Sequence, residues 1–203
     1  SAEDRTPVFV ENREIPFWLV IPYSAVTTQE PADLIIWGHG FLGNGNTNAL
    51  SGWANENNAA MLGTSFYGWA DDDFASIEFA VLNMHYFQHQ AERLEQAMIN
   101  QVVMIKTFMG ICSDLPDFYH TEEGEKMINT TSPTYTGYSN GALRGPSIIG
   151  LSPDLNRGVL WSGGSSFSHI IERCTQFDKF YFVFASEYGY DNQLDRAVAM
   201  SIM

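Results

Sequence analysis

The stretch that decides the fold is residues 133–147, PTYTGYSNGALRGPS. It begins with β-prone residues, passes through a G-x-S-x-G pentapeptide at 137–141 and continues into small residues that suit a helix. A strand that turns sharply into a helix needs small residues two positions before and after the central serine, here Gly137 and Gly141. Such a turn also leaves the serine oxygen at the end of the sheet. The pattern therefore predicts a strand, a tight turn at Ser139 and a helix.

Other apolar runs on both sides of this stretch alternate with helical patterns. Short continuous apolar runs bounded by turn residues are typical of strands that are buried on both faces. The expected strands are 7–10, 15–22, 33–38, 61–66, 133–137 and 156–162, with the first two joined by a polar turn. The expected helices are 53–60, 92–109 and 141–150, and Pro146 would distort the last one unless it lies in the first turn. This alternation predicts an α/β fold, a mostly parallel sheet with helices on both faces.

One interval between strands is unusually long. Between two of these strands, residues 71–131 make an interval of about 60 residues, more than a single crossover helix needs. We expect one domain over residues 1–203 with a helical insertion at 71–130. The sequence leaves open whether that insertion covers a site or only extends the fold.

Size and charge exclude several classes of protein. A chain of 203 residues is long enough for one domain with a substantial core. The net charge of −14 argues against a nucleic-acid partner, because phosphate binding needs clustered Lys and Arg. No apolar run approaches the roughly 18 residues of a transmembrane segment. The two cysteines, Cys112 and Cys174, leave a single disulfide open, and a periplasmic or secreted location is slightly favoured.

Neither end of the chain has the features expected of a natural terminus. It begins at Ser1 instead of Met, and residues 194–203 have the pattern of a helix without a Gly, Asn or Pro stop signal. We therefore expect this sequence to be a fragment. A partner chain or a missing segment is then expected to cover the truncated C-terminal edge of the sheet.

A second glycine motif, GHGFLG at residues 38–43, follows the expected strand 33–38. In acyl transfer the tetrahedral intermediate carries an oxyanion, which preorganised backbone N–H groups stabilise by a few kcal/mol. The N–H of Asn140, next to Ser139, is one expected donor, and the N–H of Phe41 is the other. Gly40 is the expected glycine of this loop, and His39 would orient the loop through hydrogen bonds. The other interpretation is a glycine-rich turn without a catalytic role.

With these motifs, the chain resembles α/β-hydrolases of the lipase and esterase type, and more closely a group of poorly characterised bacterial α/β-hydrolase-like proteins. The resembling segments are 35–43, 64–69, 137–143 and 151–160, and the similarity runs from about residue 15 onward. The resemblance implies a serine hydrolase of carboxylic esters that forms an acyl-enzyme at Ser139 and needs no cofactor or metal. It also implies that the triad acid and then the histidine follow the serine in the chain.

The chain departs from the family after Ser139. Only one clear strand follows, and the only later histidine, His169, lies where the family has a cap or connecting helix. The acids Asp178, Asp191 and Asp195 precede no recognisable strand with a late histidine. We therefore expect the triad acid and base beyond Met203. The alternative is a catalytically inactive α/β-hydrolase-like module that binds or assembles.

Two further groups of residues have competing interpretations. His85 and His89 are four residues apart, as metal ligands on one helix face can be, but no third ligand is evident. A metal site is therefore not expected. The aromatic residues Trp53, Phe66, Tyr67 and Trp69 either line an acyl pocket or, more commonly for such residues, pack in the core.

Overall fold

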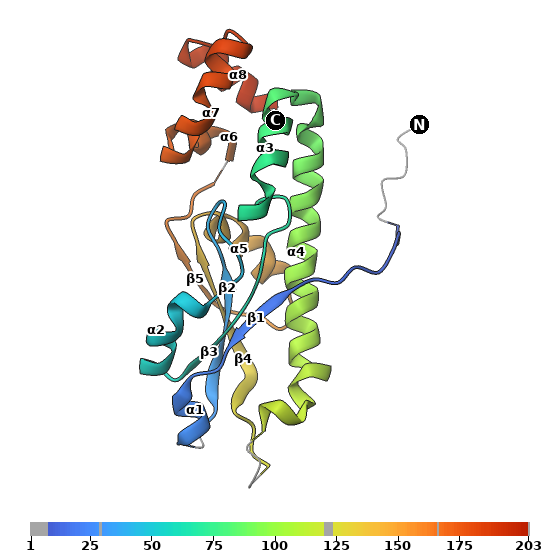
Figure 1. The fold of residues 1–203 in the computed structure, drawn as a ribbon, viewed down its shortest axis with the longest axis vertical. Coiled ribbons are helices and arrows are strands. Elements are labelled where there is room, and N and C mark those ends of the chain that lie inside the picture. The colour runs from blue at the N-terminus through green and yellow to red at the C-terminus, as the bar shows by residue number, and fades with distance from the viewer. Residues whose placement is uncertain (1–7, 29, 120–123, 166, 203) are drawn as a thin grey trace.

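The computed structural model describes residues 8–28, 30–119, 124–165 and 167–202, and its centre is a five-stranded sheet (Figure 1). The strands are β1 (Phe17–Val20), β2 (Ala32–Gly38), β3 (Ala59–Thr64), β4 (Ile128–Tyr138) and β5 (Gly158–Trp161). Their order across the sheet is β1-β3-β2-β4-β5. Only β1 is antiparallel to its neighbour, and the other pairs are parallel. The predicted α/β class with a mostly parallel sheet is confirmed.

Eight α-helices, joined by short 3-10 turns and one π-helical turn (Val183–Glu187), lie in the described part of the chain. They are α1 (Tyr23–Thr27), α2 (Ser51–Glu56), α3 (Phe74–Leu82), α4 (Phe87–Met109), α5 (Asn140–Leu151), α6 (Phe167–Ile170), α7 (Asp178–Phe182) and α8 (Gln193–Ile202). The interval 71–130 thus contains α3 and the long helix α4. Helix α5 runs through Pro146 without a break.

The order of the strands reverses at β2. The chain crosses from β2 to β3 in one direction, then passes back over β2 to β4 and onward to β5. Crossovers between parallel strands are right-handed, so crossovers in opposite directions place their helices on opposite faces of the sheet. Accordingly α4 and α5 contact each other on one face, and all six residues of β3 are buried. The carboxyl ends of β2 and β4 therefore form a topological switch point, the position at which ligands bind in open α/β sheets.

Several sequence-based boundaries differ from those of the structure. Residues 8–10 form no strand, and Pro7 lies outside the described residues, so the predicted hairpin is reduced to β1 alone. The predicted helix 53–60 ends at Glu56, and β3 begins at Ala59 instead of residue 61. Asn58 explains the second difference, because its φ of 45° lies in the left-handed region that ends helices. The chain can then enter β3 at once.

The C-terminal helices form a second cluster with α3, separate from the main core. Figure 1 shows α6, α7 and α8 at one end of the molecule, beyond the end of β5. Ile77 and Val81 of α3 pack there with Phe177 and Met200, and Leu42 from the loop after β2 lies against them. The Tyr188 hydroxyl donates a hydrogen bond of 2.8 Å to the Val81 carbonyl. The cluster therefore joins these helices to the carboxyl edge of the sheet.

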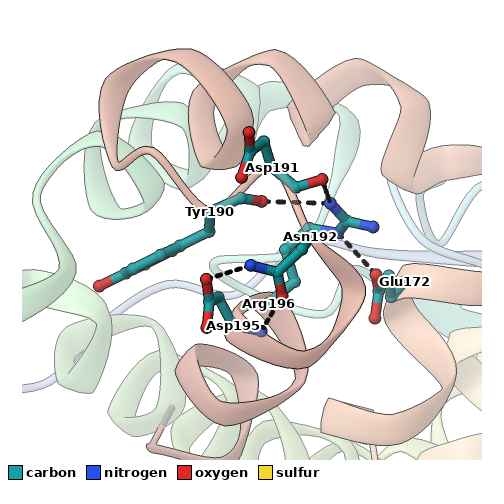
Figure 2. Close-up of polar contacts among 6 residues, drawn as sticks. All are labelled: Glu172, Tyr190, Asp191, Asn192, Asp195 and Arg196. Atoms are coloured by element: carbon teal, nitrogen blue, oxygen red, sulfur yellow. Dashed lines mark hydrogen bonds and ion pairs between the residues drawn. The ribbon is translucent and has the colours of Figure 1, made fainter.

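Arg196 of α8 holds this C-terminal unit together (Figure 2). Its Nε lies 2.6 Å from Oε1 of Glu172, and the two side chains are only 12% and 16% exposed. Its other guanidinium nitrogen, Nη1, donates to the carbonyls of Tyr190 (3.1 Å) and Asp191 (2.8 Å). One side chain thus connects the segment before α7 to the turn that leads into α8.

Candidate functional site

Ser139 is the single residue between the end of β4 and the start of α5. Its φ of 52° and ψ of −110° lie in a region that non-glycine residues rarely occupy. Such strain costs about 1–3 kcal/mol and persists only where the surroundings enforce it. The Ser139 N–H donates to the Trp161 carbonyl at 2.9 Å, which ties the turn to β5. The side chain is partly exposed, and its hydroxyl has no hydrogen-bond partner among the described residues.

The glycines beside Ser139 allow three backbone segments to meet. A Cβ on Gly141 would lie 2.1 Å from the Gly38 carbonyl oxygen, and one on Gly137 would lie 2.4 Å from the Gly141 carbonyl oxygen. Gly40 faces the turn itself, because a Cβ there would lie 3.5 Å from Cβ of Ser139. The Gly141 N–H donates to the His39 carbonyl at 2.8 Å. The loop after β2 therefore lies directly against the serine turn.

His39 fixes the shape of that loop. Nδ1 lies 2.7 Å from the Gly40 carbonyl, and Nε2 lies 2.7 Å from the backbone nitrogen of Phe66. Since the Phe66 N–H can only donate, Nε2 is the acceptor and the ring carries its proton on Nδ1. The ring is buried, and that burial lowers the pKa of His39. Both nitrogens are occupied, so His39 orients the loop and has no lone pair left for Ser139.

Acid should destabilise the protein through His39. Burial lowers its pKa in the folded state, whereas the unfolded chain takes up a proton near pH 6.5. Stability is therefore complete above that pH and falls below it, by up to about 1.4 kcal/mol per pH unit. Chemical denaturation at pH 7.5 and 5.5 measures this loss. His39→Gln should remove that share of the pH dependence, whereas His89→Gln, at an exposed position, should retain it. Equal pH dependence in the wild type and His39→Gln would contradict the prediction.

The two expected oxyanion donors are the backbone N–H groups of Phe41 and Asn140, which belong to the loop after β2 and to the start of α5. Phe41 belongs to the turn after β2, and its ring packs against Trp69 at 5.5 Å between centroids. Asn140 is the first residue of α5, a position whose backbone N–H has no partner inside the helix. The Asn140 side chain is 2% exposed, and its Oδ1 accepts a bond of 3.4 Å from Nε of Arg144. Its Nδ2 has no partner among the described residues.

No general base reaches Ser139 within the described residues. His169 is exposed on α6, and no hydrogen bond joins its ring to Ser139 in the part of the chain that the structure describes. Asp191 and Asp195 belong to the cluster before and within α8 (Figure 2). Asp178 is exposed at the start of α7. The structure therefore brings the serine and the His39 loop together without an acid and a base.

Two residues of this region were not singled out by the sequence. The Tyr135 hydroxyl, buried in the core, donates to the Gly141 carbonyl at 2.8 Å, and burial raises its pKa. Ser162, the residue after β5, has the same left-handed φ of 52° as Ser139. Gly163 then passes over the first turn of α5, where its Cβ would lie 3.1 Å from Cβ of Ala142. The repeated glycines at 163–164 were the available signal for a second tight loop at this edge.

The remaining candidates have structural roles or none. Phe66 and Trp69 are buried in the core, whereas Trp53 is exposed, so these three do not line one pocket. Cys112 and Cys174 are free thiols. His89 lies 3.3 Å from Glu92, and the described residues contain no group of three His, Cys, Asp or Glu side chains that could hold a metal.

Comparison of the sequence with protein-family models and with curated proteins found no match. Among the described residues, no helix has both the length and the apolar character to cross a membrane.

Proposed function

We propose that this protein is a serine hydrolase of carboxylic esters, lipids or other acyl esters, with Ser139 as its nucleophile. The observation that carries the proposal is the strained backbone of Ser139 between a parallel strand and a helix. The turn lies at the switch point of the sheet and against the His39 loop. A partly exposed serine held in this way can face a substrate at the sheet edge.

In the proposed reaction, the Ser139 oxygen attacks the ester carbonyl carbon and loses its proton to a general base. The alcohol leaves with that proton, and the acyl group stays on Ser139 as an ester. Water then adds to the acyl-enzyme and releases the carboxylic acid. The backbone N–H groups of Phe41 and Asn140 stabilise the negative oxygen in both steps. The base and acid come from residues other than those that the structure places around Ser139.

A fluorophosphonate probe tests this proposal on the natural full-length protein. The probe should label Ser139, as mass spectrometry of the modified peptide would show, and Ser139→Ala should abolish labelling. Ser162→Ala is the matched control, because Ser162 has the same φ at the end of the neighbouring strand and should leave labelling intact. A folded full-length protein that is not labelled would exclude the hydrolase. Labelling of the 203-residue chain alone would show that the base lies within it.

The second candidate is a module of the same architecture that binds or assembles without catalysis. Two observations favour it: the absence of a general base at Ser139 among the described residues, and the exposed apolar side chains of β5. Val159, Leu160 and Trp161 occupy a sheet edge that is free in the described structure, where a partner chain or a further strand would pair. A full-length protein that is folded, unlabelled and associated through this edge would support the second candidate.

A further inference from the structure

A cavity of about 690 Å³ lies between the N-terminal segment and α4, away from the Ser139 turn. Figure 1 shows this segment crossing the long helix before it leads into β1. The cavity is lined on α4 by residues from Gln96 to Phe108, a separation of twelve residues or about 18 Å of helix. No residue of 38–43 or 137–141 lines it. It is therefore a long groove distinct from the candidate catalytic site.

Apolar side chains supply most of the lining of this groove, beside polar ones such as Gln96 and Asn100, and the groove is open to water. On α4, Ile99 and Val103 are 49% and 55% exposed, and opposite them Val8 and Val10 are 79% and 83% exposed. Each of these side chains is apolar, and all four face one elongated space. Contiguous apolar surface of this kind marks a site for an apolar ligand or partner. The length of the lining along α4 favours an extended chain.

One end of the groove carries positive charge around Tyr67. The Arg13 guanidinium lies 4.4 Å from the centre of the Tyr67 ring, and that of Arg93 lies 5.2 Å from it. Neither forms an ion pair within the described part of the chain, although the protein has 24 acidic residues. Glu11 also lines the groove, and its charge lies within Coulombic range of Arg13. Two guanidinium groups without carboxylate partners retain donors for an anionic head group.

We propose that this groove binds a long-chain fatty acid, with its carboxylate at Arg13 and Arg93 and its alkyl chain along α4. An apolar channel with cationic donors at one end matches an amphiphile that has one anionic end. The proposal does not rest on the activity of Ser139, because the two sites share no lining residue.

The two free thiols allow a direct test with laurate as the probe. Cys112 lines the end of the groove beyond α4, whereas Cys174 lies in the cluster around α3 and α8, where its Sγ contacts the Ile171 carbonyl. Alkylation of each thiol is followed by mass spectrometry, with laurate kept below its micellar concentration. Laurate at ten times its dissociation constant should slow alkylation of Cys112 by about tenfold and leave Cys174 unchanged. Equal slowing of both thiols, or of neither, would overturn the proposal.

Substitutions in the groove test the contacts of the alkyl chain and of the carboxylate separately. Val103→Asp, at an exposed position on the groove floor, should abolish protection of Cys112. Replacing both Arg13 and Arg93 by Gln should weaken laurate binding about tenfold or more, with no effect on dodecanol, the matched neutral amphiphile. Arg157→Gln, beside β5 at the other edge of the sheet from β1, should change nothing. Equal laurate protection in the double Gln variant would overturn the role of the arginines.

Two other possible occupants of the groove would give different results in the alkylation of Cys112. If a second copy of the chain fills the groove, Cys112 becomes protected without laurate as the protein concentration rises. If the segment at residues 8–10 fills the groove, Cys112 is unreactive without laurate and becomes reactive when Val8 and Val10 are replaced by Asp. Either result would overturn the proposed fatty acid site.

Discussion

Replacing Gly141 by Ala should lower the free energy of unfolding by about 3–5 kcal/mol, among the largest effects expected of a single methyl group. The new Cβ would lie 2.1 Å from the carbonyl oxygen and 2.4 Å from the carbonyl carbon of Gly38. Both are backbone atoms, so no side-chain rotation relieves the clash. The end of β2 and the start of α5 must then separate, which breaks the hydrogen bond from the Gly141 N–H to the His39 carbonyl. The bond from the Tyr135 hydroxyl to the Gly141 carbonyl weakens as well.

Gly150 provides the matched control in the same helix. It is exposed near the end of α5, and a Cβ there would meet nothing within 4 Å. Gly150→Ala should therefore stabilise the protein by about 0.5 kcal/mol, because alanine is a better helix former than glycine. Chemical denaturation of the two variants and the wild type measures the difference. Similar unfolding midpoints for Gly141→Ala and the wild type would contradict the close approach of β2 and α5.

Replacing Arg196 by Ala should release the C-terminal helices, at a cost of about 3 kcal/mol in their stability. The substitution leaves the Glu172 carboxylate, only 16% exposed, without its partner. It also removes the donor to the Tyr190 and Asp191 carbonyls and the guanidinium that lies 5.1 Å from the centre of the Tyr181 ring. Breaking one member of a partly buried ion pair is costly because the remaining charge stays partly desolvated. Amide hydrogen exchange over residues 167–202 should accelerate, while the sheet remains protected.

Arg173 tests whether this loss is specific. It lies one residue from Glu172, is exposed and forms no ion pair among the described residues, so Arg173→Ala should change stability by less than about 0.5 kcal/mol. A double replacement, Arg196→Met with Glu172→Leu, should restore part of the stability, since an apolar pair carries no desolvation cost. If Arg196→Ala leaves hydrogen exchange in α6–α8 unchanged, the ion pair does not hold these helices.

Helix α4 shows how far local pattern reasoning extends. The apolar spacing predicted a helix over 92–109, and the structure has that helix starting at Phe87. The first turn falls within the predicted helical insertion 71–130 but outside the apolar spacing, because its sequence is largely polar. Gln90 is nevertheless buried, and its amide donates to the Ser76 hydroxyl of α3. The spacing of apolar residues cannot reveal a polar residue that is buried because of a tertiary hydrogen bond.

The hairpin expected at 7–22 failed for a related reason. Residues 8–10 have β-prone side chains, but a strand exists only where another strand pairs with it. In the described structure β1 pairs with β3, and Val8 and Val10 face α4 across the groove instead. Propensity favours an extended conformation at these residues without determining their partner.

The sequence alone determined the α/β class and the tight turn at Ser139, because apolar runs, helical periods and glycine spacing are local properties of the chain. The tertiary structure decided what surrounds that turn. The order of the strands brings β2 beside β4, so the His39 loop and Ser139 meet at the switch point although about 100 residues separate them. The fold also fixes the proton of His39 through the Phe66 N–H and leaves Ser139 without a base among the described residues. These are contacts between segments distant in sequence, which no local pattern records.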